Sequence, residues 1–240
     1  MTGYINSLQS LGTVDGPGVR AVVFAAGCPL RCIYCHNPDT WERKGGTPTE
    51  HAELATRIKR LYSYIKDGGV TFSGGEPCMQ SKFFSALADE LHCEGLHVAL
   101  DTSGAIVTEA ALELIDKCDL ILLDVKFTHD TDALRYTGTD LSGPMAVLGH
   151  CESVGKPVWI RHVVVPGIND TEEDAEALGR LIAPYGCIER IEFLPFRKLC
   201  LEKYERLGIP FALKDTPEAD ADRIKALESA CVRTMRCARK

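Results

Sequence analysis

The chain has 240 residues and a formal net charge of −7, with 45% hydrophobic and 25% charged residues. This composition is typical of a globular protein, and the acidic balance argues against a broad nucleic-acid-binding surface. No apolar run approaches the ~20 residues that cross a bilayer. The N-terminal sequence MTGYINSLQS lacks the basic and apolar regions of a signal peptide. We therefore expect a cytoplasmic protein that binds neither membranes nor nucleic acid.

Short apolar or β-branched runs alternate with longer helical patterns along the chain. Such alternation predicts βαβ units, a parallel sheet and strands that are buried on both faces. The expected strands span residues 19–25, 69–72, 96–100, 120–124, 158–165 and 188–194. The expected helices span about 49–65, 81–93, 108–117, 144–154, 171–184 and 217–236, several of them starting at a capping residue such as Ser81, Thr108 or Thr171.

Six strand–helix units predict an α/β fold of the partial, open (β/α)6 TIM-like barrel type, because a complete eight-unit barrel needs about 250 residues. No repeat or low-complexity linker divides the sequence. We expect a single domain over residues 1–240, with a core at about 14–200 and a C-terminal helical extension at about 201–240. The polar segments 127–143 and 197–216 are expected to be mobile loops.

The stretch GCPLRCIYCHN, residues 27–37, places Cys28, Cys32 and Cys35 in the pattern C-x3-C-x2-C. Clustered thiols in a chain without an export signal indicate metal binding rather than disulfides. Structural zinc requires four ligands, and His36 is poorly placed as the fourth because it is adjacent to the third cysteine. Iron–sulfur clusters are bound by thiolates, and three cysteines leave one iron of a 4Fe–4S cluster open. A zinc-stabilised binding module without catalysis and a cluster of unliganded thiols remain the alternatives.

Further polar residues and glycines fall at the C-terminal ends of the expected strands, which is where parallel α/β folds build their sites. They include the stretch Ser73-Gly74-Gly75-Glu76, the pair Asp101-Thr102, and Asp124 with Lys126. Arg161 lies within an otherwise apolar strand, and a buried arginine needs a carboxylate partner. The sequence therefore predicts one site that is fed by all six strand–helix units.

The cysteine pattern, with Tyr34 before the third cysteine, resembles the signature of the radical S-adenosylmethionine (SAM) superfamily. Further motifs resemble those of pyruvate formate-lyase activating enzymes and occur in the same order. They are GTVDGPGVR (12–20), CHN (35–37), VTFSGGEP (70–77), LDTSG (100–104), LLDVK (122–126) and VWIRHVVVPGIND (158–170). The resemblance covers about residues 3–200, and the ordered set of motifs is far more specific than any single one.

The resemblance implies an oxidoreductase that holds one 4Fe–4S cluster through Cys28, Cys32 and Cys35. The reduced cluster would cleave SAM to methionine and a 5′-deoxyadenosyl radical, which would take a hydrogen atom from a glycine Cα of a glycyl radical enzyme. The partner would be formate C-acetyltransferase (pyruvate formate-lyase), since residues 38–70 contain no cysteine for a second cluster. Another glycyl radical enzyme is the alternative. A monomer that receives electrons from flavodoxin or ferredoxin is also implied.

The resemblance also implies roles for individual residues. Glu76 would accept a hydrogen bond from the amino group of SAM, and Asp15 and His36 would contact the partner peptide. A monovalent cation would bind to Asp101, Thr102 and Asp124, with an ion pair through Lys126 as the alternative. One departure is LPFR at 194–197, where the family has LPYH. The implied SAM contacts are Tyr34, Gly74, Gly75, Glu76, Asp101, Thr102, Asp124, Lys126, Arg161, Val163, Leu194 and Arg197.

Overall fold

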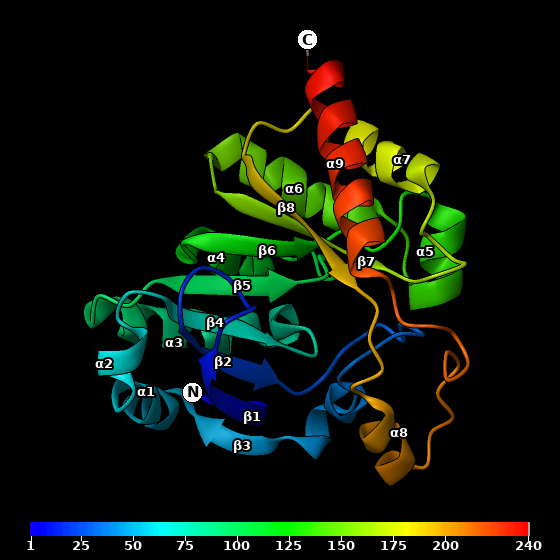
Figure 1. Ribbon diagram of the computed structural model, residues 1–240. Coiled ribbons are helices and arrows are strands. Elements are labelled where there is room, and N and C mark those ends of the chain that lie inside the picture. Colours follow the sequence, from blue (N-terminus) through cyan, green and yellow to red (C-terminus); the bar gives the residue numbers. More distant parts are fainter. Residues whose placement is uncertain (240) are drawn as a thin grey trace.

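A single eight-stranded sheet, in the order β3-β1-β2-β4-β5-β6-β7-β8, forms the centre of the molecule in a computed structural model that describes residues 1–239. Strands β2, β4, β5, β6, β7 and β8 are parallel and form a curved, open barrel with helices on its outer side (Figure 1). Their bounds are Arg20–Ala25, Gly69–Gly74, Val98–Thr102, Leu120–Asp124, Val158–Val164 and Ile188–Pro195. These are the six predicted strands, and the partial (β/α)6 barrel is confirmed.

Two further strands, β1 (Thr2–Gly12) and β3 (Thr47–Glu50), extend one edge of the sheet and were not predicted. β1 pairs antiparallel with both β2 and β3. Most residues of these two strands are exposed or half-buried, so neither strand has the continuous apolar run that marked the six inner strands.

The helices match the predicted pattern with some changes in detail. The helix expected over 49–65 is two helices separated by a turn, and it begins only after β3. Thr108 and Thr171 are N-caps as predicted, whereas Ser81 is the first residue of its helix and Gln80 is the N-cap. The bounds are α1 His51–Lys59, α2 Tyr62–Ile65, α3 Ser81–Cys93, α4 Glu109–Lys117, α5 Asp130–Thr137, α6 Ser142–Val154, α7 Glu172–Ile182, α8 Leu201–Leu207 and α9 Ala221–Ala238.

The two segments predicted as mobile loops, 127–143 and 197–216, contain helices α5 and α8, so that prediction was wrong. Both helices are short, and contacts distant in sequence hold them. The Nζ of Lys203 in α8 donates to Asn37 Oδ1 at 2.8 Å and to Asp39 Oδ1 at 3.1 Å. α8 therefore lies against the segment that follows the cysteine motif, beside the open edge of the barrel (Figure 1).

The C-terminal helix α9 packs on α7 and β8. The two helices approach closely at Gly179, where an added Cβ would lie 2.5 Å from the carbonyl oxygen of Cys231. The predicted boundary between a core and a C-terminal extension stays a prediction. Within residues 1–239, no helix combines the length and the apolar character needed to span a bilayer.

The capping box at the start of α7 allows a test of local stability. Thr171 Oγ1 accepts from the backbone N–H of Asp174 at 3.1 Å, and the Asp174 carboxylate accepts from the backbone N–H of Thr171. We expect Thr171→Ala to lower the free energy of unfolding by about 1 kcal/mol in urea denaturation, because it leaves a helix N–H without its acceptor. The control Thr56→Ala, at an exposed position inside α1, should change it by less than about 0.5 kcal/mol.

Candidate active site

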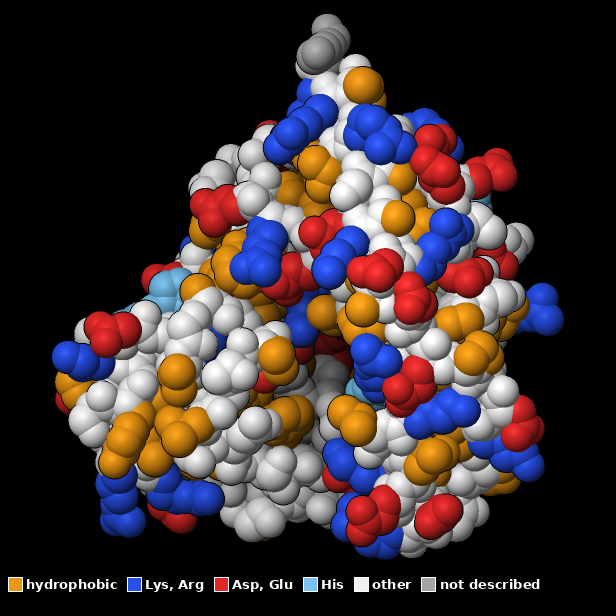
Figure 2. Space-filling view, in the orientation of Figure 1, with side chains coloured by type: hydrophobic (Ala, Val, Ile, Leu, Met, Phe, Trp, Pro, Cys, Tyr) orange, Lys and Arg blue, Asp and Glu red, His pale blue; other side chains and the backbone are white. Residues whose placement is uncertain are grey.

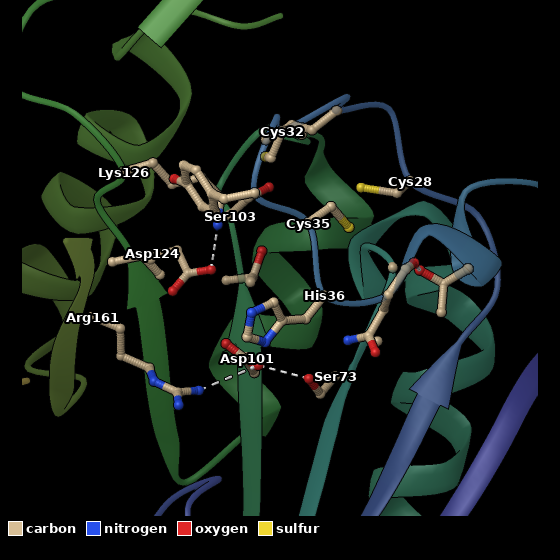
Figure 3. A pocket seen from close by; sticks show the side chains of 18 of the residues that line it. Cys28, Cys32, Cys35, His36, Ser73, Asp101, Ser103, Asp124, Lys126 and Arg161 are labelled. Carbon is tan, nitrogen blue, oxygen red and sulfur yellow. Dashed lines mark hydrogen bonds and ion pairs between the residues drawn. The ribbon is translucent and has the colours of Figure 1, made fainter. Parts of the chain in front are cut away.

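A cavity of about 230 Å³ lies at the C-terminal ends of the parallel strands. Figure 2 shows a recess near the centre of this face of the molecule, and Figure 3 shows side chains that line the cavity. Its wall is formed by Cys28, Leu30, Cys32, Tyr34, Cys35, His36, Asn37, Thr40, Ser73, Gly74, Gly75, Asp101, Thr102, Ser103, Asp124, Lys126, Arg161, Val163, Leu194 and Pro195. All six parallel strands, or the segments that follow them, contribute to this wall, as the sequence predicted.

The loop that follows β2 carries the three cysteines along one rim of the cavity, opposite Asp101 and Arg161 (Figure 3). Backbone hydrogen bonds fix the loop, including one of 3.0 Å from the N–H of Ile33 to the carbonyl of Tyr136 in α5. The side chain of Arg31 donates to two carbonyls of the same loop, those of Cys28 and Leu30, each at 2.8 Å. The loop is therefore positioned by contacts that do not involve its thiols.

The chemistry of the donor set fits an iron–sulfur cluster better than a single zinc ion. The three thiols are free and line one cavity, yet no three His, Cys, Asp or Glu side chains in residues 1–239 converge closely enough for a single metal ion. Burial raises the pKa of Cys28 to about 12 and that of Cys32 to about 11. Both thiols are therefore protonated in the metal-free protein, and binding to iron would displace their protons.

Tyr34 supplies a second observation that the cavity is built for a ligand. Its side chain is buried, and its hydroxyl has no hydrogen-bond partner among the described residues. Buried hydroxyl groups are normally hydrogen-bonded, because an unpaired one loses its contact with water without compensation. The free hydroxyl and the three thiols together fit a site that is completed by a bound group.

Gly74, the last residue of β4, and Gly75 line the cavity and also allow close packing of the backbone. Gly74 has a φ of +103°, and an added Cβ would lie 2.6 Å from the backbone nitrogen of Ala25. A Cβ on Gly75 would lie 2.3 Å from the carbonyl oxygen of Gly27. Only glycine fits both positions, because the turn after β4 packs directly against the turn after β2. The two glycines line the cavity as predicted, but contact between the two turns is a sufficient reason for them.

Glu76 is not among the residues that line the cavity, and its contact with SAM stays a prediction. Its side chain is fully buried, and its carboxylate accepts hydrogen bonds from Thr102 Oγ1 at 2.8 Å and Cys78 N at 3.1 Å. It also accepts from Ser103 N at 2.9 Å and Ser103 Oγ at 2.5 Å. Glu76 therefore joins the turn after β4 to the end of β5, and both Thr102 and Ser103 line the cavity.

Arg161 has the carboxylate partners that its burial requires. Its guanidinium lies 3.5 Å from Asp101 Oδ2 and 3.6 Å from Glu192 Oε2, and it donates to the carbonyl of Val14 at 3.1 Å. Asp101 also accepts from Ser73 Oγ at 2.6 Å (Figure 3). The arginine thus connects β5, β7 and β8 with the loop before β2, at the base of the cavity.

The second carboxylate, Asp124, is paired with Lys126 at 2.6 Å (Figure 3). Burial lowers the pKa of Lys126, but the charge of Asp124, its hydrogen bond to the lysine, and the nearby Cys32 and Tyr34 groups together more than offset it, so the pKa lies well above its ordinary value. Each of the two cavity carboxylates therefore faces a protein cation, as the ion-pair alternative expected. The monovalent cation stays a prediction, and no metal-ion group was found in residues 1–239.

Two more of the predicted contact residues lie outside the cavity wall. The guanidinium of Arg197 donates to Glu218 Oε2 at 3.1 Å, and Arg197 is not among the lining residues. Asp15 lies in the loop between β1 and β2, where its carbonyl accepts from Thr71 Oγ1 at 2.6 Å. His36 does line the cavity, and its Nε2 donates to the carbonyl of Arg197 at 2.8 Å.

Comparison with known proteins agrees with this geometry. The family model described as "4Fe-4S single cluster domain" matches residues 14–141. A pyruvate formate-lyase-activating enzyme of Clostridium pasteurianum is 40% identical over 228 residues, which cover 94% of this chain and 95% of that protein. The enzyme of the same description from Staphylococcus epidermidis is 38% identical, over 94% of this chain and 93% of that protein. The chain belongs to the pyruvate formate-lyase-activating enzyme family.

Solved structures show that the fold is shared more widely. A domain of pyruvate-formate lyase-activating enzyme from Bacteroides vulgatus has a TM-score of 0.58 and 20% identity, covering 70% of this chain and 94% of that one. A radical SAM methyltransferase from Sphaerobacter thermophilus has a TM-score of 0.64 and 16% identity, covering 90% of this chain and 64% of that one. The open barrel is therefore the radical SAM core fold.

Six of the residues that line the cavity had been given no contact with the cluster, SAM or the partner. Ser73 and Ser103 directly adjoin predicted residues, and both have hydroxyl groups that bind the cavity carboxylates or Glu76. Their position at the strand ends was the signal that they share the site. Pro195 is the last residue of β8 and directly follows Leu194. The other three belong to the cysteine loop and the 3₁₀ turn after it, where spacing gives no such signal: Leu30, Asn37 and Thr40.

Asp101 allows a test of the site's electrostatics in the metal-free protein. Burial raises its pKa to about 6, against the opposing effect of Arg161. Between pH 4 and 6 the folded state therefore binds more protons than the unfolded state. The contribution of protonated Asp101 to the free energy of unfolding is present at low pH and is lost as the pH rises through this range. We expect the unfolding free energy of the wild type, minus that of Asp101→Asn, to fall by about 2 kcal/mol from pH 4 to 6.5. A difference that rises with pH in urea titrations would contradict this prediction.

Proposed function

We propose that this protein activates pyruvate formate-lyase by generating the radical on a glycine Cα of that enzyme. The observation that carries the proposal is the set of three cysteines on one rim of a cavity, in a chain whose curated relatives bear that activity in their names over 94% of its length. A bound 4Fe–4S cluster and SAM would supply one electron and a 5′-deoxyadenosyl radical to the reaction.

The residues of the chain would bind, orient and shield these groups. Cys28, Cys32 and Cys35 would hold three irons of the cluster and leave the fourth open. Polar side chains at the base of the cavity, with Arg161 and Lys126 as the cations, would bind the charged part of SAM. Val163 and Leu194 give this end of the cavity an apolar wall, which helps to exclude water from a reactive carbon radical. The target glycine would enter through the cavity mouth, past His36.

The setting of the reaction follows from the same proposal. Flavodoxin or ferredoxin would supply the electron, and the protein would act as a monomer in the cytoplasm during anaerobic metabolism. A monovalent cation near the carboxylate of SAM would bind Asp101, Thr102 and Asp124, and it would have to compete with the existing ion pairs. Dependence of SAM affinity on potassium concentration, at constant ionic strength, would test this cation.

The test of the function is an anaerobic assay with pyruvate formate-lyase. The cluster is reconstituted and reduced, SAM is added, and 5′-deoxyadenosine is quantified together with the electron paramagnetic resonance spectrum. We expect a glycyl radical doublet and one 5′-deoxyadenosine per radical formed. Replacement of the radical-bearing glycine of the partner by alanine is the control, and it should remove the doublet.

Other results of this assay, or of a metal analysis, would favour a different function. 5′-Deoxyadenosine without a doublet would keep the SAM chemistry and assign the protein to a different glycyl radical enzyme. Zinc at one ion per chain without iron, in protein purified anaerobically, would favour the non-catalytic binding module. Neither product from a protein with an intact cluster would refute the proposed function.

A further inference from the structure

A second groove lies next to the cysteine loop, outside the cavity of the candidate site. The 3₁₀ turn Pro77–Gln80 and the start of α3 form one wall, the N-terminal residues another, and Arg43 lies at its edge. Its volume is about 530 Å³, and it shares no lining residue with the cavity. We call it the entry groove, and its relevant residues are Met1, Arg43, Met79, Lys82 and Ile106.

The entry groove reaches the backbone of the cysteine loop. A Cβ placed on Gly27 would lie 3.2 Å from Arg43 Cβ and 3.5 Å from Met79 Sδ. Gly27 directly precedes Cys28, one of the three thiols expected to bind iron. Met79 is 39% exposed, so a molecule in the groove can contact its side chain. Only Met79 and Gly27 then lie between that molecule and the backbone of Cys28.

The charge of the entry groove is opposite to that of the whole chain. The chain carries a net charge of −7, yet the groove lining includes two cationic side chains and no carboxylate. Within residues 1–239, neither Arg43 nor Lys82 forms an ion pair, although Arg43 also lies over the ring of Tyr4 at 5.2 Å. Two exposed, unpaired cations favour the approach of an acidic partner.

Exposed apolar side chains line or adjoin the groove and add to its contact surface. Met1 is 54% exposed, Met79 39% and Val107, next to the groove, 41%. Methionine is flexible and adapts its shape to a partner, so Met1 and Met79 suit a surface that contacts another protein. Weak redox complexes bury less than about 1,200 Å² and so need only a small patch.

We propose that the entry groove is the docking site of a small acidic protein that carries one electron, and that electrons reach the cluster from there. This inference rests on the proposed function. One electron leaves the reduced carrier and enters the iron site at Cys28; the carrier is oxidised by one electron, and no atom is transferred. The groove and the cavity share no lining residue, so a carrier seated in the groove leaves the cavity itself unoccupied.

The test compares two charge reversals of equal size. Arg43→Glu/Lys82→Glu reverses the groove, and Lys225→Glu/Arg236→Glu reverses two exposed charges on α9, which packs at the opposite edge of the sheet. Binding of flavodoxin and of a ferredoxin, each in its oxidised form, is measured by calorimetry at low and at physiological salt. We expect the groove variant to raise the Kd of at least one carrier by about tenfold or more at low salt, with the difference shrinking as salt screens it. The α9 control should change the Kd less than about threefold.

Reduction assays separate this inference from the proposed function. With dithionite as reductant, the groove variant should form 5′-deoxyadenosine at the wild-type rate, whereas the carrier-driven rate should fall with binding. Equal Kd values for wild type and groove variant, or binding of neither carrier by the wild type, would overturn the inference alone. Weakened binding of pyruvate formate-lyase with unchanged carrier binding would overturn it as well, and would assign the groove to the protein substrate. Absence of 5′-deoxyadenosine from the wild type with dithionite would instead refute the proposed function.

Discussion

Replacing Cys32 with alanine should abolish iron binding and SAM cleavage while leaving the fold intact. Cys32 is buried and lines the cavity, and a cluster held by only two thiolates has lost a ligand that no other cavity residue replaces. We expect SAM cleavage to fall by more than about 100-fold, since even changes outside the ligand set cost 10- to 100-fold at metal sites. The visible absorbance of the reconstituted cluster and the iron content should fall with it.

The fold should survive because the loop is positioned by its backbone and by Arg31, not by its thiols. The matched control is Cys200→Ala, which removes a thiol that is also buried but does not line the cavity. That variant should keep its iron and its activity. Full iron content and SAM cleavage in the Cys32 variant, or loss of both in the Cys200 control, would show that the ligand assignment is wrong.

The sequence predicted the inner barrel because burial on both faces leaves a clear pattern. Strands such as β6, LILLD at Leu120–Asp124, consist almost entirely of apolar residues and can only be interior strands. Only three of the eleven residues of β1 are buried, so the strand has no continuous apolar run, and it could be recognised only from its pairing with β2 and β3. α8 has little apolar periodicity, and its place depends on Lys203 meeting Asn37 and Asp39 from more than 160 residues away. Such contacts leave no local trace in the sequence.

The candidate site could likewise be predicted from the sequence only in part. Residues at strand ends, such as Asp101 and Asp124, were correctly predicted to lie in one site, because the carboxyl ends of parallel strands meet at the same edge of the sheet. Side-chain direction was not predictable, because it depends on which partners compete for each group. Arg197 turns to Glu218, and Glu76 turns to the backbone and hydroxyl groups behind the cavity. A motif gives the position of a residue, and its neighbours in space decide what it binds.

Glu76 gives the second large effect, since its carboxylate is the acceptor for four hydrogen bonds in a fully buried position. Replacing it with alanine leaves the backbone N–H groups of Cys78 and Ser103 and two hydroxyl groups without their acceptor. We expect Glu76→Ala to lower the free energy of unfolding of the metal-free protein by about 3–5 kcal/mol in urea denaturation. The exposed Glu113→Ala, on α4, is the control and should change it by less than about 0.5 kcal/mol.

The same variant decides between a structural role and a direct contact with SAM. In the structural role, SAM affinity weakens because Thr102 and Ser103 lose the group that orients them, and stability falls in the protein without SAM. In the direct role predicted from the family motif, SAM affinity would weaken while the stability of the SAM-free protein stayed unchanged. Unfolding curves of the metal-free variant and SAM titrations of the reconstituted one therefore give different results for the two roles. All four hydrogen-bond donors to Glu76 belong to the protein itself. We therefore expect Glu76→Ala to lower the free energy of unfolding of the metal-free protein, as the structural role requires.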